Sequence, residues 1–309
     1  MQIALKIDVD TYRGALIGVP RLVELLRNHQ TPATFLFSLG PDHTGRAIKR
    51  VFRRGFLKKV SRTSVVSHYG IKTLLYGTVL PGPDIGRRAA HIMQATRDAG
   101  FETGIHCWDH VRWQDGVECA DPVWTEIEMR RAHERYVEIF GVEARGHGAA
   151  GWQMNPHALR LTQRLGYRWA SDCRGTHPFI PVWNGEIVLC PQLPTTLPTL
   201  DELIGVDGHT VDNVHRHLLS LTVRAPTQGA HVFTLHAELE GIKLGAVLER
   251  LLNGWRDQGY EMTTLGKVRD GLKLATLPRH NVVRGEAPGR SGTLLMQGVE
   301  FLSDWQEVS

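Results

Sequence analysis

The sequence has no apolar run near the roughly 18 residues that a membrane-spanning helix needs, and its start lacks the cationic segment of an export signal. We therefore expect a chain that neither crosses a membrane nor carries a classical export signal. Cysteine is also scarce, and no pair has C-x-x-C spacing among Cys107, Cys119, Cys173 and Cys190. These cysteines are most simply reduced thiols of a cytoplasmic protein, which argues against a disulfide framework.

Acidic residues are missing between Asp42 and Asp84, where nine basic residues stand: Arg46, Lys49, Arg50, Arg53, Arg54, Lys58, Lys59, Arg62 and Lys72. Without these nine, the 36 basic residues of the chain would become 27 against 32 acidic ones. This stretch alone therefore makes the protein basic, and we treat residues 43–83 as a basic insertion.

Within the basic insertion, apolar residues recur every four positions, at Ile48, Phe52, Phe56 and Val60. A basic amphipathic helix with aromatic residues on its apolar side is typical of a segment that lies in a membrane interface, although Gly55 weakens one continuous helix. The pattern predicts contact with an anionic membrane surface through Arg50, Phe52, Arg53, Arg54, Phe56, Lys58 and Lys59. A solvated helix packed on the domain and a nucleic-acid patch are the alternatives, but no nucleic-acid-binding module accompanies the pattern.

The composition is that of a soluble globular protein, with 42% hydrophobic and 22% charged residues, and 309 residues can bury one large core. Apolar runs and amphipathic segments alternate, which indicates α/β architecture. The expected strands lie near 2–9, 33–38, 102–106 and 231–236, and the expected helices lie near 18–29, 85–99, 123–140 and 244–258. Periodicity alone does not distinguish a barrel from a doubly wound sheet.

Two pairs of polar residues suggest chemistry. Asp8 and Asp10 stand at the end of the first apolar run, and because strand side chains alternate between faces, both emerge on one face. His106 and His110 stand four apart, a spacing that lets two imidazoles bind one ion. Two histidines and one carboxylate make a three-ligand metal site with room for water, and the second carboxylate is placed to take that water's proton.

The position of these residues strengthens the interpretation. A D-x-D near a strand end is often a loop cap, and with 16 histidines some pairs four apart arise by chance. However, Asp8, His106 and also His236 each end an apolar run, and ligands of α/β proteins gather beyond the carboxyl ends of strands. Core packing does not explain three such strand ends. The sequence therefore has the outline of a metal hydrolase.

Several short motifs follow one another in a recognisable order: Ile7-Asp8-Val9-Asp10-Thr11, His106-Cys107-Trp108-Asp109-His110, Ala149-Ala150-Gly151-Trp152, Ser171-Asp172-Cys173-Arg174-Gly175, Leu193-Pro194-Thr195-Thr196-Leu197-Pro198-Thr199 and Leu235-His236-Ala237-Glu238. Together they resemble the polysaccharide deacetylase (NodB-homology) family, and more narrowly its 4-deoxy-4-formamido-L-arabinose-phosphoundecaprenol deformylase branch. The separation of the two aspartates by Val9 is similar to that branch. The resemblance covers residues 1–274 and leaves the tail, 275–309, unmatched.

The resemblance implies a distorted (β/α) barrel of seven strands, with the basic insertion inside domain 1–274. It also implies that Asp10, His106 and His110 bind one divalent ion, that Asp8 is the general base and that His236 is the acid. The donors suit Zn²⁺, and Co²⁺, Mn²⁺ or Fe²⁺ as well. The implied substrate is undecaprenyl phosphate carrying 4-deoxy-4-formamido-L-arabinose, at the cytoplasmic face of the bacterial inner membrane, in lipid A modification.

Other residues are candidates for substrate contacts. Trp108 and Trp152 are expected to wall a sugar pocket, with partly buried core as the alternative. Arg174 binds a phosphate or orients a carboxylate, or else forms a structural ion pair. Glu238 follows His236 by two residues and is expected to hold its ring or to lie on the surface. The Arg-, Gly- and Pro-rich tail predicts a flexible arm with a short docking segment.

Two rival functions stay open. One is removal of acetyl from peptidoglycan or another N-acetyl sugar, against which the basic insertion argues. The other is a non-catalytic barrel that binds lipid or sugar. A binding module needs no acid and base, so the joint presence of Asp8, Asp10 and the three histidines argues against it.

Overall fold

The computed structural model of the chain describes residues 1–47, 71–226, 229–290 and 292–302. Its central sheet has seven strands: β1 (Gln2–Val9), β2 (Thr34–Ser38), β3 (Glu102–Cys107), β4 (Gly146–His147), β5 (Trp169–Ala170), β8 (His231–His236) and β9 (Glu261–Thr263). The order is β5-β4-β3-β2-β1-β8, β9 also pairs with β1, and all these pairings are parallel. The four strands expected from the sequence are confirmed.

β1 lies at the centre of this sheet, between β2 and β8. All its residues except Gln2 are buried, as a strand covered on both faces requires. Two polar residues interrupt the apolar run from Ile3 to Val9: Asp8, and Lys6, whose side chain is fully buried. This central strand therefore places Asp8 and Asp10 at the carboxyl edge of the sheet.

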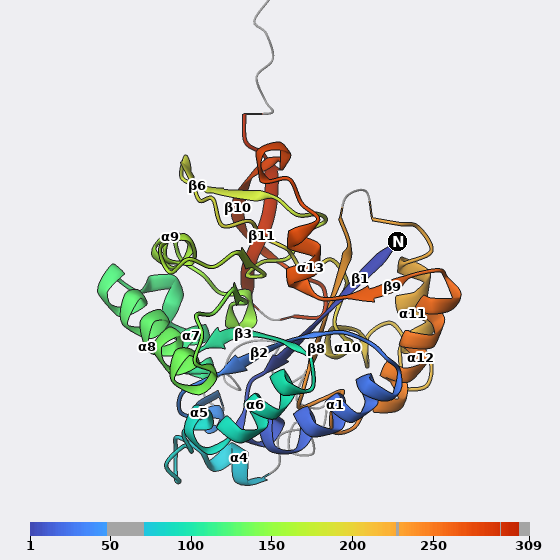
Figure 1. Cartoon of the computed structure of the whole chain (residues 1–309), viewed down its shortest axis with the longest axis horizontal. Coiled ribbons are helices and arrows are strands. Elements are labelled where there is room, and N and C mark those ends of the chain that lie inside the picture. Colours follow the sequence, from blue (N-terminus) through green and yellow to red (C-terminus); the bar gives the residue numbers. More distant parts are fainter. Residues whose placement is uncertain (48–70, 227–228, 291, 303–309) are drawn as a thin grey trace, which may run out of the picture.

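Helices cover the outside of the sheet. They are α1 (Val19–Asn28), α5 (Ile85–Arg88), α6 (Ala90–Asp98), α7 (His110–Gly116), α8 (Pro122–Phe140), α9 (Pro156–Arg164), α11 (Val214–Leu221), α12 (Gly245–Asp257) and α13 (Leu265–Asp270), with the short α4 (Ile71–Leu75) and α10 (Leu200–Leu203). α8, α6, α1 and α12 pack in that order around the sheet (Figure 1). Asp121 caps α8 by accepting from Trp124 N, and Gly141 ends that helix with a φ of 69°.

The helix expected over 85–99 is two helices in the structure. The backbone leaves the helical region at Ala89, where φ is −108°, and this residue separates α5 from α6. Ile85, Ala89 and Met93 are all buried and spaced by four, so the apolar pattern continues across the break. Periodicity reports the buried side of a segment but not a local change of backbone angle.

The barrel is closed by an irregular segment. β5 and β8 stand at the two ends of the strand order. Between them, Leu193 N donates to Ala170 O of β5 at 2.7 Å, and Thr196 N donates to Val232 O of β8 at 3.1 Å. The proline-rich stretch around Pro194 therefore bridges the gap with backbone hydrogen bonds. The predicted distorted, seven-stranded α/β barrel is confirmed in this form.

The flexible arm expected for the tail is wrong for most of its length. β10 (Arg279–Glu286) and β11 (Thr293–Glu300) form an antiparallel hairpin, which we call the C-terminal hairpin. β10 pairs in parallel with β6 (Ile180–Trp183), and β7 (Glu186–Ile187) completes a second sheet of four strands. Composition suggested flexibility, but the strands are stabilised by pairing with β6, a segment about a hundred residues earlier.

The amphipathic pattern of the basic insertion lies mostly outside the described residues. Its predicted membrane-facing positions fall there: Arg50, Phe52, Arg53, Arg54, Phe56, Lys58 and Lys59. Among the residues that are described, no helix combines the length and the apolar character required to cross a membrane.

The C-terminal hairpin belongs to the main core, and this can be tested on one strand. Leu295 is fully buried in the core of the barrel, whereas Val299 on the same strand is 62% exposed. Leu295→Ala should lower the free energy of unfolding by about 2–5 kcal/mol because it leaves a cavity. Val299→Ala should change it by about 0.5 kcal/mol or less. Equal, small effects in chemical denaturation would contradict a hairpin that folds with the barrel.

Candidate metal centre

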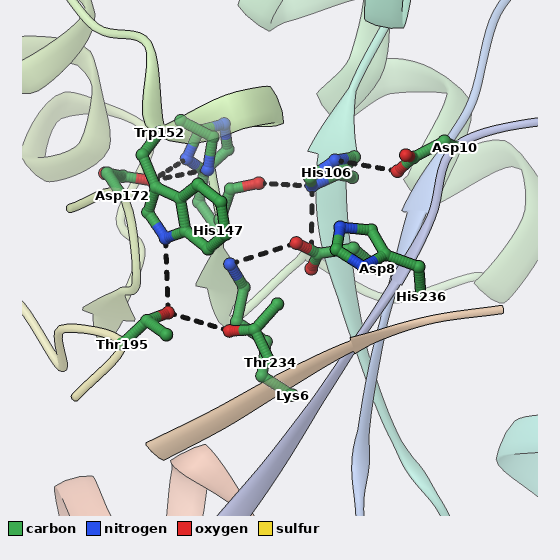
Figure 2. A network of polar contacts seen from close by, with 12 residues as sticks. Lys6, Asp8, Asp10, His106, His147, Trp152, Asp172, Thr195, Thr234 and His236 are labelled. Atoms are coloured by element: carbon green, nitrogen blue, oxygen red, sulfur yellow. Dashed lines mark hydrogen bonds and ion pairs between the residues drawn. The ribbon is translucent and has the colours of Figure 1, made fainter. Parts of the chain in front are cut away.

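Four elements bring the predicted polar residues to one edge of the sheet. Asp8 lies near the end of β1 and Asp10 directly follows it; His106 lies near the end of β3, and His110 is the first residue of α7. His236 ends β8, where it is the register partner of Asp8. Parallel strands end at the same edge, so residues far apart in the sequence meet there (Figure 2).

Asp10, His106 and His110 form a compact cluster. Each offers one ligand atom, and these atoms lie within 4.8 Å of one another. Asp10 Oδ1 is 3.2 Å from His106 Nε2, and Asp10 Oδ2 is 3.3 Å from His110 Nε2. Burial alone would raise the pKa of Asp10, but His110 and His106 outweigh it and hold that pKa well below its usual range. The carboxylate is therefore ionised, as a metal ligand must be.

The hydrogen bonds of this cluster fit a divalent cation. His106 Nδ1 donates to Gly148 O at 2.6 Å, so in the neutral imidazole that a metal ligand requires, the lone pair of Nε2 faces Asp10. Asp10 Oδ1 is buried and accepts no hydrogen bond among the described residues. An imidazole lone pair and a carboxylate oxygen that face each other in a buried site need a positive charge between them. Two histidines and one carboxylate are a donor set that divalent metals accept.

The turn between the two histidines is fixed by Asp109. Its Oδ1 accepts from Arg112 N and caps α7, which begins at His110. Its Oδ2 lies 2.5 Å from Nδ1 of His43, at the start of the basic insertion. The turn from strand to helix therefore brings two imidazoles four residues apart to one carboxylate. Sequence reasoning missed His43, because no local pattern connects it to Asp109.

Asp8 has two different oxygens. Its Oδ2 forms an ion pair with Lys6 Nζ at 3.2 Å, and both side chains are almost completely buried. Its Oδ1 accepts no hydrogen bond among the described residues and lies 3.8 Å from His106 Nδ1 (Figure 2). Lys6 was not among the predicted residues, although its period-two spacing from Asp8 and Asp10 places all three on one face of β1.

His236 is surrounded by carboxylates. Its backbone N donates to Glu240 Oε2 at 2.7 Å. Burial lowers the pKa of His236, but Asp201, Asp10, Asp8 and Glu240 together raise it above its ordinary value. A raised pKa favours the protonated imidazole, which suits the predicted proton donor.

Two of the predicted substrate contacts, Trp152 and Arg174, have structural partners. Trp152 is 1% exposed, and its ring faces the cations of Lys6, Arg174 and Arg290 at 5.1, 5.1 and 4.5 Å. Arg174 forms an ion pair with Glu202 at 2.7 Å, which is the structural alternative considered for it. We therefore assign both residues to the support of the site.

Glu238 holds the loop after β1 and not the ring of His236. It is buried, and its Oε1 accepts from Asp10 N at 3.1 Å and from Thr11 N and Oγ1 at 2.8 Å each. Burial, followed by the charge of Asp10, raises the pKa of Glu238 to about 8. Trp108 is half-buried, with Arg135 over its ring at 5.1 Å, and its contact with a sugar stays a prediction.

A second buried network lies beside the cluster of Asp10, His106 and His110. His147 Nδ1 is 2.7 Å from Asp172 Oδ1, which also accepts from Ala149 N, and Gln192 holds the same aspartate through Nε2. These bonds fix the loop after β4, which carries Gly148 and so the carbonyl that orients His106. Part of the Ser-Asp-Cys-Arg-Gly motif therefore acts on the metal centre indirectly.

Two curated proteins are similar to the chain over nearly its whole length. A probable 4-deoxy-4-formamido-L-arabinose-phosphoundecaprenol deformylase, ArnD, of Shewanella sediminis (strain HAW-EB3) is 37% identical over 296 residues, which cover 96% of this chain and 94% of the relative. A protein of the same description from Wigglesworthia glossinidia brevipalpis is 30% identical, and the match covers 92% of this chain and 98% of the relative. No family model matches the chain.

Solved structures with the same fold share little sequence. A putative polysaccharide deacetylase from Mycobacterium smegmatis has a TM-score of 0.63 at 18% identity, with 93% of this chain and 94% of that chain covered. A family 4 acetyl xylan esterase from Clostridium thermocellum, solved in complex with a cobalt ion, has a TM-score of 0.50 at 11% identity, with 89% of this chain and 94% of that chain covered. These likenesses concern the fold.

Removal of one imidazole should remove the metal. Because the cluster offers three ligands, His106→Ala and His110→Ala should each weaken metal affinity at least about tenfold, as even loss of a supporting contact does. Elemental analysis after dialysis should then find metal in the wild type and little in either variant. His91→Ala changes an exposed histidine of α6 and serves as the control for adventitious binding. Full occupancy in both ligand variants would refute the assignment.

Proposed function

The chain belongs to the 4-deoxy-4-formamido-L-arabinose-phosphoundecaprenol deformylase family, and from this premise we propose that it removes the N-formyl group of that lipid-linked sugar. Its family membership makes it a hydrolase of the deformylase and deacetylase type, which cleaves amide bonds. The proposed products are formate and the free amino sugar on undecaprenyl phosphate, for lipid A modification. The meeting of Asp10, His106 and His110 with Asp8 and His236 at one edge of the sheet carries the proposal.

Asp10, His106 and His110 would hold one divalent cation, for which Zn²⁺, Co²⁺, Mn²⁺ and Fe²⁺ are all suitable. Such an ion lowers the pKa of a water molecule and polarises a carbonyl oxygen. In the proposed reaction Asp8 Oδ1 accepts a proton from water as the water oxygen bonds to the formyl carbon. His236 then donates a proton to the sugar nitrogen as the carbon–nitrogen bond breaks, so that the amine leaves neutral.

The substrate is tested by the acid that is released. Purified protein, supplied with the metal it binds, is incubated with the formamido sugar linked to undecaprenyl phosphate, and in parallel with the corresponding acetamido compound. We expect release of formate at a rate well above that of acetate. Acetate alone would identify an N-deacetylase of an N-acetyl sugar. Binding of the lipid-linked sugar without release of either acid would identify a non-catalytic barrel.

The proton donor is tested by His236→Ala. An amine is a poor leaving group unless it is protonated, so the variant should lower turnover by about 10²- to 10⁴-fold. Metal content should stay that of the wild type, because His236 is not in the ligand cluster. Formate release close to the wild-type rate would remove His236 from the mechanism.

We also propose that the protein is peripheral at the cytoplasmic face of the bacterial inner membrane, where a lipid-linked sugar is within reach. The charge of the basic insertion supports this, since nine basic and no acidic residues stand between Asp42 and Asp84. Anionic headgroups attract such a segment with about 1 kcal/mol for each Lys or Arg near the surface. The basic insertion would then hold the protein at the membrane in which the lipid carrier of the substrate lies.

Neutralising the insertion should release the protein from vesicles. The variant replaces Arg50, Arg53, Arg54, Lys58 and Lys59 by Gln; in low salt it should sediment less with vesicles of anionic lipid than the wild type does. It should also hydrolyse the long lipid-linked substrate more slowly, while a short-chain soluble analogue is hydrolysed at the wild-type rate. Equal losses on both substrates would instead indicate a structural role, and unchanged sedimentation would contradict membrane binding.

A further inference from the structure

Lys6 is a charged residue whose side chain lies in the protein interior. Its side chain is fully buried in the middle of β1, where every buried neighbour along the strand except Asp8 is apolar. A buried ammonium is costly unless it is paired, and its partner here is Asp8 Oδ2, 3.2 Å from Nζ. A second contact is the ring of Trp152, whose centroid lies 5.1 Å from Nζ.

The surroundings leave Lys6 little freedom to move. Gly148 lies against it, because a Cβ at that position would stand 3.0 Å from Lys6 Cε. Trp152 is itself held by a hydrogen bond from Nε1 to Thr195 Oγ1 at 3.1 Å, and Ala287 and Leu294 of the C-terminal part pack on it. The ammonium is therefore confined beside one oxygen of Asp8.

The two oxygens of Asp8 are divided by this contact. Oδ2 faces Lys6, whereas Oδ1 is buried, accepts no hydrogen bond among the described residues and lies on the side of His106. We propose that Lys6 is the positioning residue of the general base: it holds Oδ2 and thereby directs Oδ1 at the water that attacks the amide. This inference rests on the proposed hydrolysis, in which Asp8 takes the proton of that water.

A merely structural lysine would behave differently. Removal of one member of a buried ion pair lowers stability whichever role Lys6 has, because the other charge is left unpaired, so a loss of stability in Lys6→Met does not distinguish the two roles. A positioning residue affects the chemical step and leaves binding of the substrate and of the metal unchanged. The two roles are therefore separated by kcat, KM and metal content measured on the same variants.

The activity test compares Lys6→Met with Lys6→Arg. Lys6→Met should lower kcat of the metal-loaded enzyme by about 10²-fold, the cost typical of a small misplacement of a catalytic group, with KM and metal content unchanged. Lys6→Arg keeps the charge and should recover part of that loss. Thr34→Val is the matched control and should leave kcat unchanged, because Thr34 is the buried register partner of Lys6 on β2 and its hydrogen bonds join it to Glu102 and Leu265. An unchanged kcat in Lys6→Met would overturn the proposal.

A second measurement does not depend on the substrate. Thermal unfolding of Lys6→Met, Asp8→Asn and the double variant should be non-additive, because each single change leaves the other group buried without its partner. Additive shifts would overturn the coupling of Lys6 to Asp8. If the wild type releases acetate and no formate, the proposed substrate fails, and the effect of Lys6→Met on kcat is then measured on the acetamido compound.

Discussion

The structure depends on burying two carboxylates, Asp8 and Asp10, at the end of its central strand. Each is less than a tenth exposed, and isolated charges are not stable in a protein interior. The groups around the two carboxylates are arranged to meet this requirement. Lys6 pairs with Asp8 from within β1, and His106 and His110 face Asp10 from β3 and α7. A divalent ion in that cluster would complete the neutralisation, so the metal site and the stability of the sheet edge have the same physical origin.

The residues around Asp10, His106 and His110 mainly hold these three side chains in place. Gly148 O sets which nitrogen of His106 carries the proton, Asp109 caps the helix that begins with His110, and Glu238 accepts from the backbone of Asp10. The contacts of Gly148 and Glu238 join segments that lie apart in the sequence, whereas the helix cap of Asp109 is local. A site of this kind is rigid because it is built on strand ends and helix starts, with few free loop residues.

The C-terminal hairpin connects the edge of the fold to its centre. Arg174 N donates to Leu295 O of β11, and Arg290 lies over the ring of Trp152, which in turn lies over Lys6. Trp152 therefore lies between the tail and the buried ion pair of Lys6 and Asp8 and contacts both. The extension therefore packs into the same core as the barrel, and the match to the curated relative from Shewanella sediminis, over 96% of the chain, reaches into it.

The sequence by itself determined the strands and the polar residues at their ends. Period-two alternation puts Asp8 and Asp10 on one face, and apolar runs that stop at His106 and His236 mark strand ends, because both signals are local. Tertiary structure decided the partners: Lys6 with Asp8, Trp152 beneath three cations, Glu238 on the loop of Asp10, and the hairpin on β6. These contacts depend on which distant segments pack together, and no short pattern records that. Composition misjudged the tail for the same reason, since its strands are stabilised by pairing with a remote partner.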